Sequence, residues 1–154
     1  MRTLKQRAIG LLARREHSRA ELMRRLSSAG GQRAELDAVL DELEAAGLLS
    51  DVRFSAALVE QKRATHGRRA IAYALREKGV EAGQAADALG ALDADDERSR
   101  ALALWTRRFG VPPRDDREKA RQIRFLIARG YPGSVAFDVL RTAASLSSED
   151  VESA

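Results

Sequence analysis

The sequence contains no cysteine, few aromatic residues and no long apolar run, and each absence narrows what the protein can be. Without cysteine, the chain has no disulfide, no thiolate metal ligand and no cysteine nucleophile. No segment combines a basic start with an apolar run, as an export signal does, and none approaches the length of a membrane span. We therefore expect a cytoplasmic protein that does not interact with a membrane.

The residues that are abundant favour helices. Alanine, leucine, arginine and glutamate dominate the 154 residues, whereas aromatic residues make up only 5%. These four types are strong helix formers, so we expect an all-α fold. Hydrophobic residues reach 44% and charged residues 32%, which is typical of a folded chain and not of a disordered one. The formal net charge of +4 permits a polyanionic partner without requiring one.

One short pattern occurs three times at nearly equal intervals. The pattern Leu-x-x-x-Gly ends at Gly30, Gly79 and Gly130, so the intervals are 49 and 51 residues. A leucine follows each glycine by ten residues, and a basic residue precedes it by eleven; these positions are Leu40, Leu89 and Leu140, and Arg19, Arg68 and Lys119. Glycine suits the position after a helix because it enters the left-handed region without steric cost. Each glycine is therefore predicted to end the second helix of a three-helix repeat.

The repeat predicts both local helix boundaries and the organisation of the chain. Ser18 and Glu21 fit a capping box at the start of the second helix. We expect three tandem three-helix repeats at residues 1–49, 50–92 and 97–144, followed by a flexible tail at residues 145–154. If each repeat packs mainly on its neighbours, the result is an elongated rod, straight or curved, in place of a globule.

Charge alternates along the chain in step with the repeat. Residues 1–30 contain eight basic and two acidic residues, whereas residues 31–60 contain two and seven. Residues 61–80 contain six and one, residues 81–97 none and six, and residues 98–130 ten and three. The first two helices of a repeat are thus basic and the third is acidic. Two interpretations remain open: the basic helices align into one cationic stripe, or acidic third helices pair with basic second helices of neighbouring repeats.

Motifs for catalysis and for reading a DNA groove are weak. The third helix of the first repeat, at residues 35–44, contains five acids and no base, so DNA phosphates would repel it. His17 and His66 precede second helices, and a helix boundary explains them better than a metal site. The acids within residues 115–118, with Lys119, resemble a nuclease cluster, but a charged first helical turn explains them better. We expect no enzyme activity, no metal and no cofactor.

Four stretches resemble the RecX family of regulatory proteins. They read ARREHSRAEL at 13–22, LEAAGLLSDVRFSAALVEQK at 43–62, GRRAIAYALREKGV at 67–80 and RFLIARGYPGSVAFDVL at 124–140. The stretches occur in the expected order, and the resemblance covers about residues 7–143. Ala74 is one departure, because members of that family often carry a glutamate before the following leucine.

The resemblance implies three tandem three-helix repeats and one partner, the bacterial recombinase RecA. RecX-like proteins lodge in the groove of the RecA–DNA filament, in which RecA holds single-stranded DNA and ATP. There they suppress ATP hydrolysis, strand exchange and coprotease activity, and some also contact DNA. The chain is therefore expected to be a negative regulator of RecA in homologous recombination, DNA repair and the SOS response. The alternatives are a sequence-independent DNA-binding protein that acts through its basic stripe, and a structural adaptor for another acidic assembly.

Basic residues of the first two helices of each repeat are the expected contacts with the filament or with DNA. Four of them lie near the middle of the chain and four extend the stripe towards either end. The set is Arg19, Arg24, Lys62, Arg63, Arg68, Arg69, Lys119 and Arg121. Trp105 is interpreted as a packing residue and not as a platform on which a base stacks.

Overall fold

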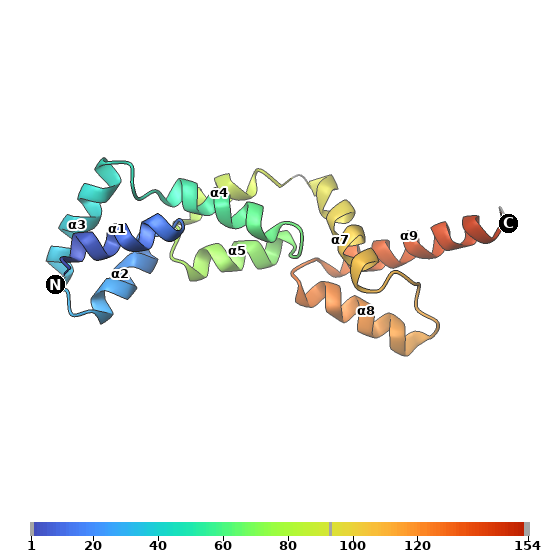
Figure 1. Cartoon of the computed structure of the whole chain (residues 1–154). Coiled ribbons are helices and arrows are strands. Elements are labelled where there is room, and N and C mark those ends of the chain that lie inside the picture. Colours follow the sequence, from blue (N-terminus) through green and yellow to red (C-terminus); the bar gives the residue numbers. More distant parts are fainter. Residues whose placement is uncertain (1, 93, 153–154) are drawn as a thin grey trace. The chain divides into compact units, whose positions relative to one another are not determined.

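The computed structural model describes residues 2–92 and 94–152, and these residues form nine α-helices and no strand (Figure 1). The helices are α1 (Leu4–Arg14), α2 (Arg19–Ser28), α3 (Arg33–Ala45), α4 (Asp51–Lys62), α5 (Arg68–Glu77), α6 (Ala82–Leu89), α7 (Ala94–Arg108), α8 (Asp116–Ala128) and α9 (Gly133–Glu152). The all-α class predicted from the composition is confirmed for the described residues.

The chain divides into two compact units. Unit 1 comprises residues 1–59 and 74–88, and unit 2 comprises residues 60–73 and 89–154, so the division falls within α4 and within α5. Each unit has its own apolar core. The core of unit 1 contains Ala8, Leu22, Leu26, Leu36, Leu40, Leu43 and Leu49. The core of unit 2 contains Ala101, Leu104, Trp105, Leu126, Tyr131, Ala136, Val139, Leu140 and Ala143.

Local side-chain contacts fix where the second helices of the first and third repeats begin. The Ser18 hydroxyl accepts a hydrogen bond from the backbone N–H of Glu21, and the Glu21 carboxylate accepts one from the backbone N–H of Ser18. The Asp115 carboxylate accepts a hydrogen bond of 2.8 Å from the N–H of Glu118 at the start of α8. These contacts satisfy amide groups that the first turn of a helix leaves unpaired. The predicted capping box and the predicted charged first turn are both confirmed.

The three repeated glycines end helices as predicted. Gly30, Gly79 and Gly130 follow α2, α5 and α8, and their φ angles are 95°, 75° and 96°. This left-handed conformation is costly for any residue with a Cβ atom. The leucines ten residues further along, Leu40, Leu89 and Leu140, are all buried.

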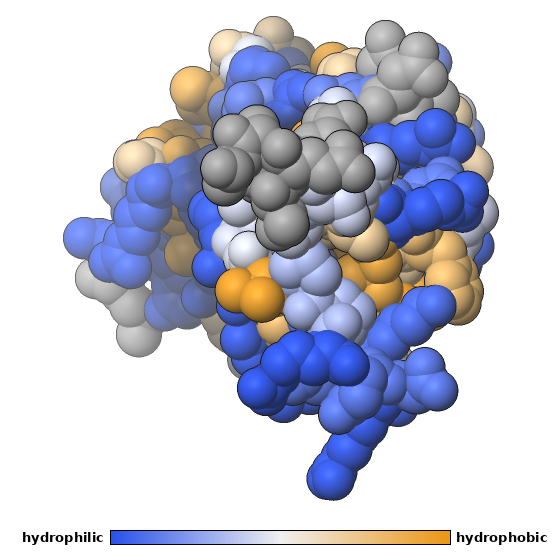
Figure 2. All heavy atoms as spheres, turned by 90° about the vertical axis from the view of Figure 1, so that its right-hand side faces the viewer, coloured by the Kyte–Doolittle hydropathy of each residue, from blue (hydrophilic) through white to orange (hydrophobic). Residues whose placement is uncertain are grey.

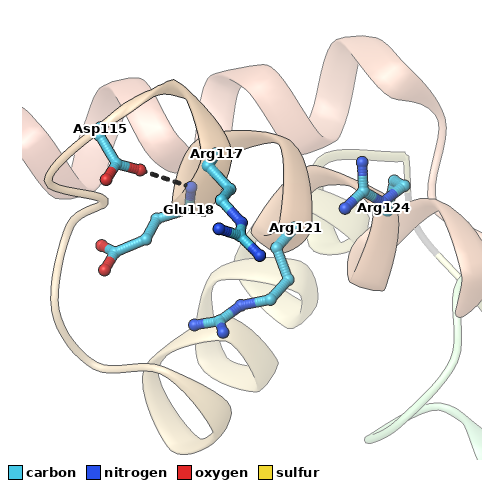
Figure 3. A pocket seen from close by; sticks show the side chains of 5 residues that line it. All are labelled: Asp115, Arg117, Glu118, Arg121 and Arg124. Atoms are coloured by element: carbon cyan, nitrogen blue, oxygen red, sulfur yellow. Dashed lines mark hydrogen bonds between the residues drawn. The ribbon is translucent and has the colours of Figure 1, made fainter.

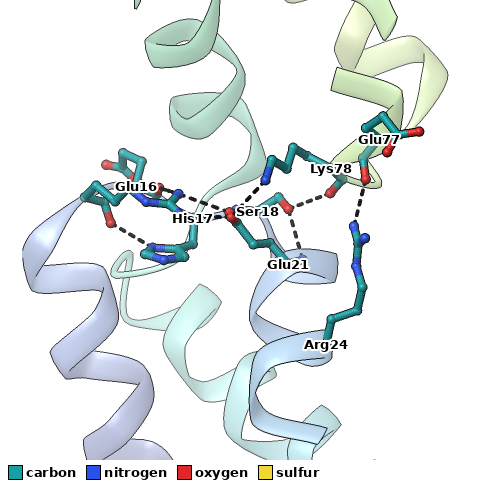
Figure 4. A network of polar contacts seen from close by, with 8 residues as sticks. Glu16, His17, Ser18, Glu21, Arg24, Glu77 and Lys78 are labelled. Carbon is teal, nitrogen blue, oxygen red and sulfur yellow. Dashed lines mark hydrogen bonds and ion pairs between the residues drawn. The ribbon is translucent and has the colours of Figure 1, made fainter. Parts of the chain in front are cut away.

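In unit 1, the glycine after α5 packs against the start of α2. A Cβ atom added at Gly79 would collide with the Cβ atom of Ala20. Beside this contact, the Ser18 hydroxyl donates a hydrogen bond of 2.6 Å to the carbonyl oxygen of Lys78 (Figure 4). The Lys78 ammonium group lies 3.3 Å from the Glu21 carboxylate. We call this contact between the end of one helix and the start of another a helix-end joint.

Unit 2 contains a second helix-end joint, between the end of α8 and the start of α5. A Cβ atom added at Gly130, after α8, would collide with Ala70 near the start of α5. The backbone N–H of Gly67 donates a hydrogen bond of 2.8 Å to the carbonyl oxygen of Arg129. The repeated glycine therefore does two things: it ends a helix, and its lack of a side chain lets that end approach another helix closely.

The structure differs from the sequence prediction near the C-terminus. α9 continues to Glu152, so the segment from Ser145 that was expected to be a flexible tail is helical up to that residue. The segment contains no glycine or proline that would end the helix. Residues 153–154 lie outside the described residues. α7 begins at Ala94, before the predicted start of the third repeat at residue 97. The division into three repeats and the rod shape stay predictions.

Candidate anion-binding site

The eight basic residues predicted to bind a partner are distributed over both units. Arg19 and Arg24 lie on α2 in unit 1. Four others lie around the turn between α4 and α5 in unit 2, and this turn meets the C-terminal end of α8 at the helix-end joint. Lys119 and Arg121 are in the first half of α8, away from that contact. The structure therefore does not bring the members of unit 2 into one cluster.

Arg19 is bound by carboxylates of its own unit. Its guanidinium group lies 2.8 Å from Asp41, 2.8 Å from Glu44 and 3.3 Å from Asp37, all on α3. Hydrogen bonding to Glu44 is the largest of the effects that raise the pKa of Arg19. Basic second helix and acidic third helix thus do pair, but here within one repeat and not between neighbours.

Arg63 and Arg68 also have internal partners. The Arg63 guanidinium lies 3.1 Å from the Asp96 carboxylate and 3.4 Å from that of Glu60. The Arg68 guanidinium donates a hydrogen bond of 3.0 Å to the carbonyl oxygen of Leu89. An outside anion that binds either side chain would compete with these contacts.

The other five predicted residues have side chains that are more available. Arg24 is exposed and donates one hydrogen bond, of 2.8 Å, to the carbonyl oxygen of Glu77. The side chains of Lys62 and Arg69 make no hydrogen bond or ion pair within the described part of the chain, and Arg69 is exposed. Arg121 is likewise exposed and unpaired there.

Lys119 belongs to a mixed apolar and basic surface. Its ammonium group lies 5.8 Å from the centre of the Phe137 ring, which is 48% exposed. Both residues line a hollow of about 270 Å³ that also includes Pro112, Pro113, Leu140, Arg141 and Ala144. Exposed apolar areas that alternate with hydrophilic side chains are visible on the face of the molecule shown in Figure 2. A lysine in such surroundings can contact a carboxylate beside an apolar group of a partner.

Arg121 lies in a second hollow, which contains three arginine side chains of α8. The hollow has a volume of about 430 Å³ and is lined by Asp115, Arg117, Glu118, Arg121 and Arg124 (Figure 3). Arg117, Arg121 and Arg124 are spaced i, i+4 and i+7, so they share one face of the helix. All three are exposed, and none of their guanidinium groups makes a hydrogen bond or ion pair within the described residues.

The two carboxylates of this hollow already have partners. Asp115 caps α8, and the Glu118 carboxylate lies 2.9 Å from the Arg114 guanidinium. Hydrogen bonds from Arg114 lower the pKa of Glu118, and the charge of Arg121 adds a smaller effect in the same direction, so this carboxylate is ionised and already bound to Arg114. Arginine forks match the oxygen atoms of phosphate and carboxylate groups, and the hollow is therefore a candidate anion-binding site.

Of these three arginines, only Arg121 is among the residues predicted from the sequence. Arg117 and Arg124 are not among them, although their spacing with Arg121 on a predicted helix is a signal that points to one shared face. The interpretation of Trp105 is confirmed: it is 4% exposed, and its indole N–H donates a hydrogen bond of 2.8 Å to Gln122.

The two histidines lie at helix boundaries, as predicted. His17 is buried, its Nδ1 atom lies 3.0 Å from the carbonyl oxygen of Arg15, and burial lowers its pKa. His66 Nδ1 lies 2.8 Å from the Thr65 hydroxyl. Among the described residues, no group of three or more histidine, aspartate or glutamate side chains could hold a metal ion. None of the helices in the described residues is both long enough and apolar enough to span a membrane.

The fold and these surfaces define a class: all-α proteins with several separate basic surfaces. The model of the second three-helix domain of RecX matches residues 50–89, and the model of the third matches residues 95–140. A Regulatory protein RecX from Leptothrix cholodnii is 50% identical, and the match covers 92% of this chain and 89% of the relative. One from Ralstonia nicotianae is 42% identical, with 94% and 90% covered. The chain belongs to the RecX family of regulatory proteins.

Solved structures agree with this assignment at the level of the fold. A crystal structure of regulatory protein RecX has a TM-score of 0.76 and 20% identity, covering 88% of this chain and 70% of that one. RecX from Lactobacillus salivarius also has a TM-score of 0.76, with 16% identity, and 92% and 94% are covered.

Proposed function

We propose that this protein is a negative regulator of the RecA recombinase. It binds in the groove of the RecA–DNA filament and inhibits ATP hydrolysis, strand exchange and coprotease activity. The observation that carries the proposal is the 50% identity to a regulatory protein RecX over 92% of the chain. The RecX resemblance implies RecA as partner, and a cytoplasmic location follows from that partner.

The helical architecture gives a physical reason why such binding could be effective. A filament presents the same protein surface many times, and a chain with several separate basic surfaces can contact more than one copy. Linked weak contacts raise the overall affinity because each contact increases the effective concentration of the next. Binding shifts the filament away from its active state only if the protein binds the inactive state more tightly.

The proposed contacts are the predicted basic residues, together with two arginines revealed by the structure. The side chains without strong internal partners are Arg24, Lys62, Arg69, Arg117, Lys119, Arg121 and Arg124. Arg19, Arg63 and Arg68 remain in the proposal, but we expect each to contribute less. Their guanidinium groups would have to exchange existing hydrogen bonds for new ones, and the net gain is then small.

The test is ATP hydrolysis by RecA on single-stranded DNA, measured against increasing amounts of this protein. We expect inhibition at substoichiometric ratios by the wild-type chain. Neutralising the α8 hollow with Arg121→Gln/Arg124→Gln should raise the half-inhibitory concentration about tenfold, which corresponds to about 1.4 kcal/mol. The matched control is Arg33→Gln/Arg76→Gln, which removes two exposed arginines that lie outside the proposed contacts. A wild-type chain that leaves hydrolysis unchanged would contradict the proposed function.

The second candidate is sequence-independent DNA binding without RecA. The observation that favours it is the set of three unpaired arginines on α8, which can bind DNA phosphates as well as protein carboxylates. Titrations of bare single- and double-stranded DNA over a series of salt concentrations separate the two. Tight binding with a steep salt dependence, combined with no effect on RecA, would favour this candidate.

A further inference from the structure

Unit 1 contains a cluster of arginines that the sequence analysis did not identify. A hollow of about 290 Å³ between α1 and α2 is lined by Arg2, Arg7, Arg14 and Arg25, with Gly10, Leu11, Leu26 and Ala29. We call it the arginine hollow. Its lining contains no carboxylate, and all four arginines are exposed.

The four guanidinium groups have no internal counter-charge. Within the described residues, none of them makes a hydrogen bond or an ion pair. Six acids of unit 1 form ion pairs with other basic residues: Glu21 with Arg15 and Lys78, Glu42 with Lys5, Glu16 with Arg53, and Asp37, Asp41 and Glu44 with Arg19. Within the described residues, five basic residues of unit 1 have such ion pairs, whereas the four arginines around this one hollow have none.

The floor of the hollow is small and apolar. Gly10 lies in the middle of α1, where glycine is less favourable than alanine. The Nη1 atom of Arg2 lies 3.6 Å from the position that a Cβ atom of residue 10 would occupy. A larger side chain at this position would fill the space beneath the guanidinium group. Leu11 and Leu26 complete a surface on which an apolar part of a ligand can lie.

We infer that the arginine hollow binds the phosphate backbone of a single nucleic-acid strand. A guanidinium group can donate two parallel hydrogen bonds to the oxygen atoms of a phosphate group. Four guanidinium groups around one hollow therefore favour a ligand with several negative charges. Arg7 and Arg14 are seven residues apart on α1, or about 10 Å along the helix axis, so their guanidinium groups can contact two phosphate groups that follow one another. A strand provides phosphates in a row, and its sugars and bases can contact the apolar floor.

This inference deepens the proposed function, because it assigns the nucleic-acid part of the filament to one surface of unit 1. The inference rests on the proposed function only in assuming that the strand is the one held in the RecA filament. Binding of a free strand can be measured without RecA, so failure of the inference and failure of the proposed function give different results.

The experiment measures the anisotropy of a fluorescent single-stranded oligothymidylate with the full chain at several salt concentrations. Arg7→Gln/Arg14→Gln should weaken binding at least tenfold at low salt. Loss of two phosphate contacts should also reduce the slope of log K against log salt by about 1.4. The control Arg33→Gln/Arg76→Gln should stay within about threefold of wild type, because two charges are removed at exposed sites outside the hollow.

A second pair, Arg2→Gln/Arg25→Gln, tests the same hollow from its other side and should also weaken binding. Circular dichroism verifies that each variant retains its helices. Wild-type affinity and salt slope in both hollow variants would overturn the inference. Competition by polyglutamate as strong as that by unlabelled strand would assign the hollow to an acidic protein segment instead. Equal competition by a nucleoside triphosphate or inorganic phosphate would assign it to a small ligand and would also overturn the inference.

The same variants are then assayed for inhibition of RecA ATP hydrolysis. Hollow variants that lose strand binding but still inhibit RecA would support the inference. They would also mean that the other basic surfaces are sufficient for inhibition of RecA. Hollow variants that bind strands normally would overturn the inference, whatever their effect on RecA.

Discussion

The Ser18 hydroxyl donates a hydrogen bond of 2.6 Å to the carbonyl oxygen of Lys78, sixty residues later in the chain. The same hydroxyl oxygen accepts a hydrogen bond of 3.1 Å from the N–H of Glu21, so one side chain both starts α2 and holds the end of α5. In unit 2, the backbone N–H of Gly67 makes the corresponding contact with Arg129. The two helix-end joints thus use different groups to hold the end of one helix against the start of another. The effect of a substitution on stability can therefore be predicted for each joint separately.

Ser18→Ala removes both the helix cap and the donor to Lys78. We expect the free energy of unfolding to fall by about 1–3 kcal/mol, since a lost cap costs about 1 kcal/mol and the carbonyl oxygen loses its partner. Urea unfolding followed by circular dichroism measures the change. The control is Ser145→Ala, at an exposed position on α9, which should change stability by less than about 0.5 kcal/mol. Equal stability of the two variants would contradict this role of Ser18.

Gly79→Ala should destabilise the protein more than Gly30→Ala. Both glycines have a positive φ angle, so both substitutions incur a conformational cost of about 1–2 kcal/mol. Only at Gly79 does the new methyl group also collide with Ala20, whereas nothing lies within 4 Å at Gly30. Overpacking of this kind adds about 1–3 kcal/mol. Thermal or urea unfolding of both variants measures the difference.

A compensating substitution tests whether the collision is the cause. Ala20→Gly removes the methyl group that Gly79→Ala would meet, and the double variant should recover part of the lost stability. Ala20→Gly alone costs about 1 kcal/mol in helix propensity, so the double-mutant cycle must show a favourable interaction between the two changes. Strict additivity would mean that the close approach of Gly79 to Ala20 is not the origin of the difference.

Stability should fall at acidic pH because of Glu21. Burial of this carboxylate acts to raise its pKa, but hydrogen bonds from Arg15 and the charge of Lys78 outweigh burial and hold the pKa of Glu21 at about 2. A pKa below the unfolded value of 4.5 stabilises the fold above pH 4.5, and this stabilisation is lost as the pH falls towards 2. The expected contribution is about 3 kcal/mol. Urea unfolding between pH 2 and pH 6 measures it.

The matching variant is Glu21→Gln, which has no charge to lose over this range. It should be less stable than the wild type at pH 6, and the difference should shrink as the pH falls. If the difference between the two chains does not change with pH, the Glu21 carboxylate does not contribute in this way.

Features that depend on neighbouring residues could be predicted from the sequence. Ser18 and Glu21 form a capping box because the interacting groups are three residues apart, and the glycine at position 79 ends a helix whatever it packs against. The alternation of basic and acidic segments was equally clear from the sequence. The helical continuation beyond Ser145 differs from the predicted tail, because no glycine or proline in this segment ends the helix.

Features that depend on distant residues could not be predicted in the same way. The repeat places a basic residue at positions 19, 68 and 119 without indicating what each side chain contacts. In the structure, Arg19 pairs with acids of α3, Arg68 donates to Leu89, and Lys119 lies over Phe137. One repeat position therefore serves three different contacts. The arginines of α8 and of the arginine hollow differ from paired arginines only in the residues that surround them in the fold. The repeat pattern does not indicate those surroundings.

The contacts of Arg19 predict that it contributes more to stability than Arg24, although both are basic residues of α2 proposed as contacts. Arg19→Gln leaves Asp37, Asp41 and Glu44 without their shared cation, and we expect a loss of about 1–2 kcal/mol at low salt that shrinks at high salt. Arg24→Gln removes one exposed hydrogen bond to Glu77 and should cost less than about 0.5 kcal/mol. Urea unfolding at low and high salt measures both.

The assay of RecA inhibition should rank these two variants in the opposite order. Once differences in the folded fraction are accounted for, Arg24→Gln should weaken inhibition more than Arg19→Gln, because the Arg24 side chain is exposed while that of Arg19 is held by three carboxylates. A loss of inhibition confined to Arg19→Gln would mean that binding of the partner releases Arg19 from α3, and it would place the contact surface on the side of α2 that faces α3.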